Sequence, residues 1–145
     1  MKVRRVVIDT NVLISAALIA NSPPALAVNL ALQHGRVVFS ESTFAELETR
    51  LWRAKFDRYL TLEARKALLH DWRAVSDWVS PGTSTTAIRH SRDADDDRFV
   101  HAALAGGAEL LISGDRDLLD LGAVAGVVIV TPAQALPLIE AWGRG

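Results

Sequence analysis

Val6-Val7-Ile8-Asp9-Thr10-Asn11 begins with three β-branched residues and then turns polar within one position. A short apolar run without polar alternation is typical of a strand buried on both faces, as in a parallel sheet. Beyond this segment, apolar residues recur at helical spacing from Val12 to Ala17. A buried strand followed at once by a helix is the repeating unit of α/β folds, so the segment predicts an α/β protein.

The same alternation continues along the chain. Further apolar runs of strand length lie at Val37–Phe39, Leu110–Ile112 and Val127–Val130. The segments between and around these runs predict helices at Ala25–Gln33, Ser40–Arg53, Leu62–Trp78, Phe99–Ala105 and Ala133–Trp142. Residues 81–86 are expected to form a loop. Strands that alternate with helices predict a mainly parallel sheet covered by helices on both faces.

Composition narrows the class of protein. The chain has 145 residues, half of them hydrophobic, and residues 1–145 are expected to form one domain with a substantial core. The formal net charge of −1 gives no overall attraction to nucleic acid, so a local patch would have to hold such a partner. The absence of cysteine excludes disulfides and thiolate metal sites. Because no apolar stretch resembles a signal peptide or a membrane helix, we expect a cytoplasmic protein without membrane contact.

Four carboxylates lie within five residues at Asp93-Ala94-Asp95-Asp96-Asp97, directly before an apolar helical pattern. One or two acids suit a helix N-terminus, as a cap and as a partner of the helix dipole. Four acids repel one another unless a cation neutralises them. Asp9 and Asp115 each follow a predicted strand. In open α/β sheets ligands bind beyond the carboxyl ends of the strands, so these acidic segments are expected to share one rim.

The other acids also have structural explanations. Asp9 could cap the helix that follows it. Glu46 could form a capping box with Thr43 and an ion pair with Arg50, so spacing alone indicates a structural role. The segment Ser113–Asp117 could be a simple turn.

Taken together, the separated acids offer hard oxygen ligands without a His or Cys cluster; they are Asp9, Glu46, Asp97 and Asp115. Such a set suits Mg²⁺ or Mn²⁺ better than Zn²⁺. These ions favour phosphoryl transfer, in which one metal activates water and a second stabilises the leaving oxygen. The glycine-rich patterns GxxxxGK[ST] and GxGxxG are both missing from the sequence, which disfavours nucleotide-cofactor enzymes.

The ordered motifs Ile8–Leu13, Glu46, Asp93–Phe99 and Ile112–Leu119 resemble those of PIN-domain ribonucleases. The resemblance is closest to the VapC-like toxin components of prokaryotic toxin–antitoxin pairs. It implies a three-layer α/β/α sandwich and cleavage of single-stranded RNA that depends on Mg²⁺ or Mn²⁺. It also implies a cognate antitoxin as partner, and it favours a homodimer.

The resemblance assigns roles to individual residues. It implies that the catalytic, metal-binding acids are Asp9, Glu46, Asp97 and Asp115, with Asp117 as a possible further ligand. It thereby reverses the structural interpretation of Glu46. Within the acidic run, Asp93 is expected to be the helix cap, whereas Asp95 and Asp96 are supporting or solvated acids. Asn11 and Ser113 stand where the family has small polar residues that support the site.

A basic stretch could hold the RNA. Between Arg50 and Arg73, seven basic residues stand against three acidic ones, a net charge of +4. Basic and aromatic side chains together bind single strands, but the aromatic residues here (Trp52, Phe56 and Tyr59) are better explained as core or interface residues. Arg50 and Arg53 share a predicted helix face with Glu46 and are expected to reach RNA phosphates.

Two other kinds of function compete with a ribonuclease. A Mg²⁺-dependent phospho-acceptor domain also uses strand-end aspartates, but it needs a lysine at a later strand end, and no lysine follows Lys66. A phosphatase with an aspartate nucleophile would want a second acid at the position of Asn11. The remaining alternative is a catalytically silent PIN-like binding domain, against which the intact set of acids argues.

Overall fold

Six strands form one sheet in the order β3-β2-β1-β4-β6-β5 in the computed structural model, which describes residues 3–144. Their bounds are β1 Arg5–Ile8, β2 Arg36–Phe39, β3 Asp77–Trp78, β4 Leu110–Ile112, β5 Ala123–Val124 and β6 Val127–Val130. Neighbouring strands run parallel except β5 and β6, which are antiparallel. The sheet is therefore mainly parallel, as the alternating pattern predicts.

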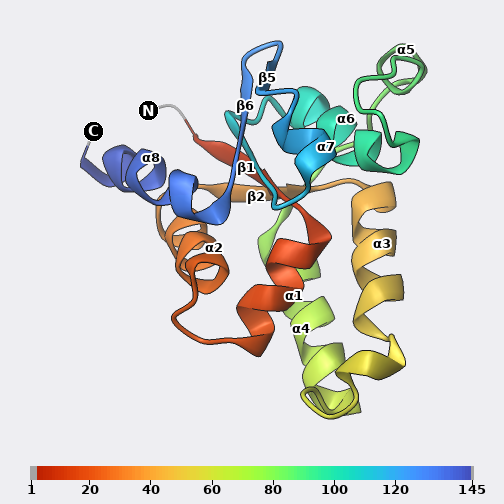
Figure 1. Ribbon diagram of the computed structural model, residues 1–145, viewed down its shortest axis with the longest axis vertical. Coiled ribbons are helices and arrows are strands. Elements are labelled where there is room, and N and C mark those ends of the chain that lie inside the picture. The colour runs from red at the N-terminus through yellow and green to blue at the C-terminus, as the bar shows by residue number, and fades with distance from the viewer. Residues whose placement is uncertain (1–2, 145) are drawn as a thin grey trace.

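Eight α-helices and two 3₁₀ turns connect the strands in the described part of the chain (Figure 1). They are α1 Thr10–Leu18, α2 Pro23–His34, α3 Glu41–Leu51, η1 Ala54–Phe56, α4 Leu62–Val75, α5 Thr83–Thr86, η2 Ala94–Asp96, α6 Asp97–Gly106, α7 Arg116–Leu119 and α8 Pro132–Arg144. α3 and α4 extend well away from the sheet, and the turn that joins them lies at the far tip of the molecule (Figure 1).

Alternate residues of the strands enter two separate cores. Val6 and Ile8 of β1 pack with α1, α2, α3, α4 and α8 on one face of the sheet. Val7 packs with α6 and α7 on the other face. Because side chains of a strand point alternately to its two faces, an apolar run such as β1 contributes to both cores. The fold is thus a three-layer α/β/α sandwich.

The strand register sets the position of the site. Ile8 of β1 lies opposite Ile112 of β4, so the two neighbouring strands end at the same level. The amide of Asp9 donates to the carbonyl of Ile112 at 2.9 Å, and the amide of Ser113 donates to Val130 at 2.9 Å. β1 is also where the strand order reverses, with β2 on one side and β4 on the other. Ligands bind at such points in open α/β sheets.

The structure adds two elements that the sequence pattern does not predict, the short helix α7 and the edge strand β5, and it differs from the predicted elements in other places. The helix expected at Leu62–Trp78 ends at Val75, and Asp77–Trp78 instead pairs with β2 as an edge strand. Trp78 continues the apolar pattern of α4, but its ring packs on Phe39 at 6.0 Å between centroids. The helix expected at Ser40–Arg53 ends at Leu51, and the loop expected at residues 81–86 contains the short helix α5.

Within residues 3–144, no single helix is long and apolar enough to cross a membrane; α1 and α2 pass that test only as a pair, bent by 106°.

Candidate metal centre

Asp9 and Ser113 meet where β1 and β4 end. The Ser113 hydroxyl donates to Oδ2 of Asp9 at 2.7 Å and accepts the amide of Asp115 at 2.9 Å. Asp9 precedes α1, but its side chain makes no capping hydrogen bond. Burial raises the pKa of Asp9, and the Ser113 hydroxyl partly opposes that rise. Asp9 occupies the N-cap position of α1, the backbone amide of Asn11 also lowers the pKa of its carboxylate, and Ser113 supports that buried carboxylate as expected.

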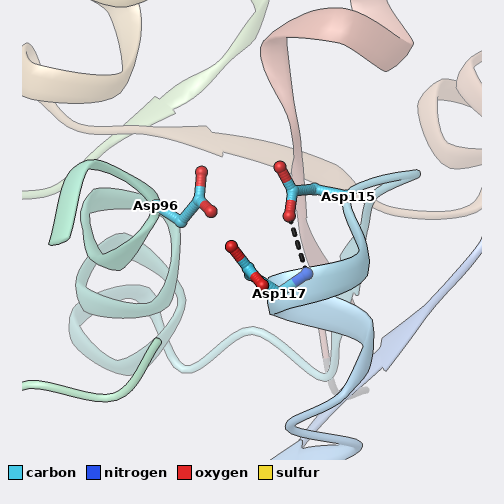
Figure 2. A group of neighbouring side chains, drawn as sticks. All are labelled: Asp96, Asp115 and Asp117. Atoms are coloured by element: carbon cyan, nitrogen blue, oxygen red, sulfur yellow. Dashed lines mark hydrogen bonds between the residues drawn. The ribbon is translucent and has the colours of Figure 1, made fainter. Parts of the chain in front are cut away.

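Three carboxylates converge beside this pair, at Asp96, Asp115 and Asp117 (Figure 2). One oxygen of each lies within 4.8 Å of the others. Asp115 caps the short helix α7 by accepting the amide of Asp117 at 2.8 Å, so the turn also fixes the acids in place. Asp96 enters from the other side, at the junction of η2 and α6. Three acids from two distant segments thus face one point.

Among these three acids, Asp96 is the one whose negative charge its surroundings disfavour most clearly. Burial and the neighbouring carboxylates, first that of Asp115, raise its pKa from 3.8 to about 7. Its Oδ2 atom is buried and has no hydrogen-bond partner within residues 3–144. A buried carboxylate oxygen without a donor is unfavourable, and a cation would both pair with it and offset the repulsion. The donor set contains oxygen only, which fits Mg²⁺ or Mn²⁺.

Asp97 does not belong to this group, contrary to the expectation from sequence. Its buried carboxylate accepts the amides of Ser91 at 2.7 Å and His90 at 3.3 Å, and it pairs with Arg89 at 3.2 Å. His101, one turn later on α6, also contacts this loop through Ile88. This face of α6 therefore contacts residues 88–91, and Asp96 rather than Asp97 lies beside Asp115 and Asp117.

The remaining acids of the run have local partners. Asp93 accepts the amide of Asp95 at 3.0 Å and so caps η2, which leads into α6. Its predicted capping role is confirmed for that turn. Asp95 is exposed and lies 3.8 Å from Arg98. Neither acid is part of the group of three.

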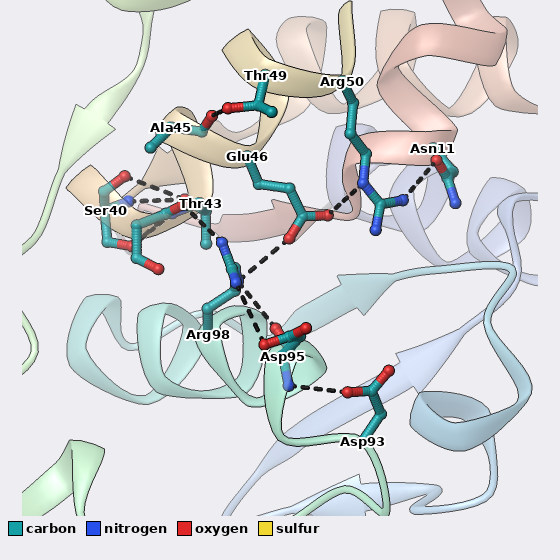
Figure 3. Close-up of polar contacts among 11 residues, drawn as sticks. Asn11, Ser40, Thr43, Ala45, Glu46, Thr49, Arg50, Asp93, Asp95 and Arg98 are labelled. Atoms are coloured by element: carbon teal, nitrogen blue, oxygen red, sulfur yellow. Dashed lines mark hydrogen bonds and ion pairs between the residues drawn. The ribbon is translucent and has the colours of Figure 1, made fainter. Parts of the chain in front are cut away.

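Glu46 is not one of the three clustered acids, and it lies between two arginines (Figure 3). Its Oε1 pairs with Arg50 at 3.1 Å and its Oε2 with Arg98 at 3.1 Å. Burial raises the pKa of Glu46, while both arginines lower it and Asp9 raises it. The predicted ion pair with Arg50 is confirmed. The predicted capping box is wrong, because the box of α3 is formed by Ser40 and Thr43.

The two arginines predicted to bind RNA lie in different places. Arg50 donates to Oδ1 of Asn11 at 3.1 Å, which connects α3 with the start of α1 beside Asp9. Arg53 follows the end of α3, so it does not share a helix face with Glu46 as expected. Much of the basic stretch lies at the tip formed by α3, η1 and α4, away from the strand ends (Figure 1).

Two basic residues at the site were missed in the sequence. Arg92 pairs with Asp117 at 3.0 Å and also contacts Asp120. Arg98 pairs with Glu46 and donates to the carbonyl of Asp95 at 2.9 Å. Both arginines flank the acidic run, and the alternation of charge there could have indicated that cations accompany the acids.

An acidic rim beyond the strand ends of an open α/β sheet is typical of nucleases and other phosphoryl-transfer enzymes. The chain belongs to the PIN domain family, whose sequence pattern matches residues 5–117. PIN domains are in general nucleases, and the resemblance seen in the sequence is confirmed at the level of the family.

Individual relatives agree with this assignment. The chain is 34% identical over 119 residues to the uncharacterized protein MJ1680 of Methanocaldococcus jannaschii, covering 81% of this chain and 74% of that protein. Its fold is similar to that of VapBC2 from Rickettsia felis bound to a DNA fragment from their promoter (TM-score 0.58, 12% identity, 86% of this chain and 96% of that one). It is also similar to FitAcB from Neisseria gonorrhoeae (TM-score 0.58, 19% identity, 88% and 97%).

Proposed function

We propose that this protein is an endoribonuclease that uses Mg²⁺ or Mn²⁺ to hydrolyse phosphodiester bonds of single-stranded RNA. The observation that carries the proposal is the convergence of Asp96, Asp115 and Asp117, with an unpaired buried oxygen on Asp96. Asp9 lies close enough to raise the pKa of Asp96 and completes the acidic rim. Glu46 is proposed as the acid on the opposite side of the rim.

In the proposed reaction, some residues bind the metal and others compensate the negative charge of the acids. Asp96, Asp115 and Asp117 would hold the cation, with Asp9 kept in place by Ser113. When bound, the metal supplies a polarised phosphoryl oxygen and a water of lowered pKa. Arg50 and Arg98 offset the charge of Glu46, and Arg92 offsets that of Asp117, so the rim can admit a phosphodiester. Arg50 remains the arginine best placed to contact RNA phosphates.

The biological role of the protein is proposed from its motifs and its fold. The motif order and the similarity in fold to VapBC2 and FitAcB support a toxin that a cognate antitoxin inhibits. A homodimer and a cytoplasmic location belong to the same proposal. A catalytically silent binding domain is disfavoured, because none of the acids on the rim is replaced.

The test is cleavage of a single-stranded RNA with Mn²⁺ or Mg²⁺. The wild type should cleave it and EDTA should stop the reaction, whereas Asp96→Asn and Asp115→Asn should reduce the rate by roughly a hundredfold or more. Asp71→Asn, an exposed acid on α4, is the matched control and should keep the wild-type rate. Equal rates for all four proteins, or cleavage that survives EDTA, would refute a metal-dependent active site here.

A further inference from the structure

A hollow of about 490 Å³ lies between the start of α3, residues 79–81, α5 and the η2–α6 segment. Its polar lining includes Glu41, Ser42, Ser80, Thr86, Asp95 and Arg98, and Val79 and Pro81 add apolar surface. Its volume is in the range of small-molecule sites, which combine apolar walls with a few polar groups. The proposed cleavage reaction does not use this hollow.

Two residues of the hollow border the acidic rim. Asp95 lines the hollow, whereas its neighbour Asp96 faces Asp115 and Asp117. Successive Cα atoms are only about 3.8 Å apart, so the two sites are separated by the thickness of one chain segment. Arg98 lines the hollow and pairs with Glu46 on the rim (Figure 3). The hollow therefore lies within one residue of the rim along the chain, which is the spacing that a nucleotide next to the scissile phosphate would need to span.

The charges of the hollow disfavour a phosphate. It carries two exposed carboxylates, Glu41 and Asp95, against one arginine, Arg98, which pairs with both Asp95 and Glu46, and one histidine, His101, whose ring contacts the carbonyl of Ile88. A neutral ligand that donates N–H groups to carboxylates fits better. The hollow also offers donors, because the amides of Glu41 and Ser42 lie in the first turn of α3, where no intrahelical acceptor exists. Ser40 satisfies the amide of Thr43 and leaves those two amides without a described partner.

We propose that this hollow binds a guanine base of the RNA, in the nucleotide adjacent to the cleaved bond. Guanine is the RNA base that places two N–H donors, at N1 and N2, side by side with a carbonyl acceptor at O6. A carboxylate accepts both N–H groups, and an amide or guanidinium donates to O6. The walls formed by Val79 and Pro81 contact the face of the base. The inference rests on the proposed ribonuclease function and names the base that this site selects.

Binding of the free nucleoside tests the hollow without catalysis. Guanosine and adenosine are titrated calorimetrically into the metal-free protein in EDTA, since a nucleoside carries no phosphate. Guanosine should bind roughly tenfold or more tightly than adenosine. Glu41→Gln, which removes one carboxylate, and Thr86→Trp, which fills the hollow, should each abolish that difference. Glu48→Gln and Ser84→Trp lie outside the lining and should preserve it.

Cleavage of four RNAs that differ only in one base next to the target bond tests specificity. The wild type should prefer guanine by roughly tenfold or more, and Glu41→Gln should cut all four at similar rates. Equal cleavage of the four RNAs by the wild type, or unchanged preference in both Glu41→Gln and Thr86→Trp, would overturn the proposal and leave the ribonuclease function intact. A wild type that cuts no RNA would instead refute the ribonuclease function, and the guanosine titration would then decide the hollow alone.

Discussion

Replacing Asp96 with asparagine should stabilise the metal-free protein at alkaline pH. Asp96 has a folded-state pKa of about 7, above its ordinary 3.8, because burial and nearby carboxylates disfavour its charge. For an acid with a raised pKa, the folded protein loses stability as the pH rises from the unfolded pKa to the folded pKa. Below about pH 3 the side chain is neutral in both states and has no such effect. Asparagine never ionises, so the variant avoids the loss.

The expected magnitude follows from the two pKa values. The interval from 3.8 to about 7 spans roughly three pH units, and each is equivalent to about 1.4 kcal/mol, which sets an upper bound of about 4 kcal/mol. Asp96 is only partly buried, and solvent screens part of the repulsion, so we expect about 1–2 kcal/mol at pH 8. For a chain of this size that corresponds to a rise in Tm of roughly 3–8 °C.

The assay is thermal unfolding of wild type and Asp96→Asn in EDTA at pH 4.5 and pH 8. The advantage of the variant should be small at pH 4.5 and largest at pH 8. Added Mn²⁺ should reverse the order at pH 8, because it stabilises only a protein that binds it. A variant that is less stable than wild type at pH 8 in EDTA would refute the electrostatic reasoning. A variant that gains as much from Mn²⁺ as wild type would refute the metal site.

Three further outcomes are expected. Asp97→Asn should lower the free energy of unfolding by about 1–3 kcal/mol, since the carboxylate holds the amides of the 88–91 loop, yet keep Mn²⁺ binding by calorimetry. Ser113→Ala should remove the hydrogen-bond donor to Asp9 and raise the pKa of that acid further. The acidic limb of the pH–rate profile should then move to higher pH, and an unmoved limb would show that Asp9 takes no part in catalysis. Arg50→Ala should weaken RNA binding and reduce its salt slope by about one, whereas Arg53→Ala should change neither, as measured by fluorescence anisotropy over a salt series.

The strands that carry the site could be predicted because their sequences are unambiguous. β1, β2, β4 and β6 are short runs of β-branched and apolar residues, which only a strand buried on both faces explains well. β3 could not be predicted in this way, since Asp77–Trp78 contains a charged residue and continues the apolar stripe of α4. Its conformation is set by pairing with β2 and by the packing of Trp78, which are contacts with residues distant in sequence.

The part of the candidate site that lies at the ends of the strands could be predicted from the sequence. Asp9 and Ser113 follow buried strands, and the parallel register, which places Ile8 opposite Ile112, brings them together. Helix faces were less predictable, because a small error in a helix boundary moves a side chain to another face. Because α3 ends at Leu51, Arg53 does not lie on the helix face that carries Glu46. The 3₁₀ turn η2 before α6 sets which acid of the run points to the rim.

Partners explain why the four acids of the run have different roles. Asp93 accepts a backbone amide, Asp95 lies by Arg98, and Asp97 is surrounded by the amides of the 88–91 loop. Each of these carboxylates has a local group that accounts for its charge. Oδ2 of Asp96 has none among the described residues, and the acids nearest to Asp96 repel it. Folding alone disfavours a carboxylate in that position, so the missing partner is the observation that supports our proposal of a cation bound at Asp96.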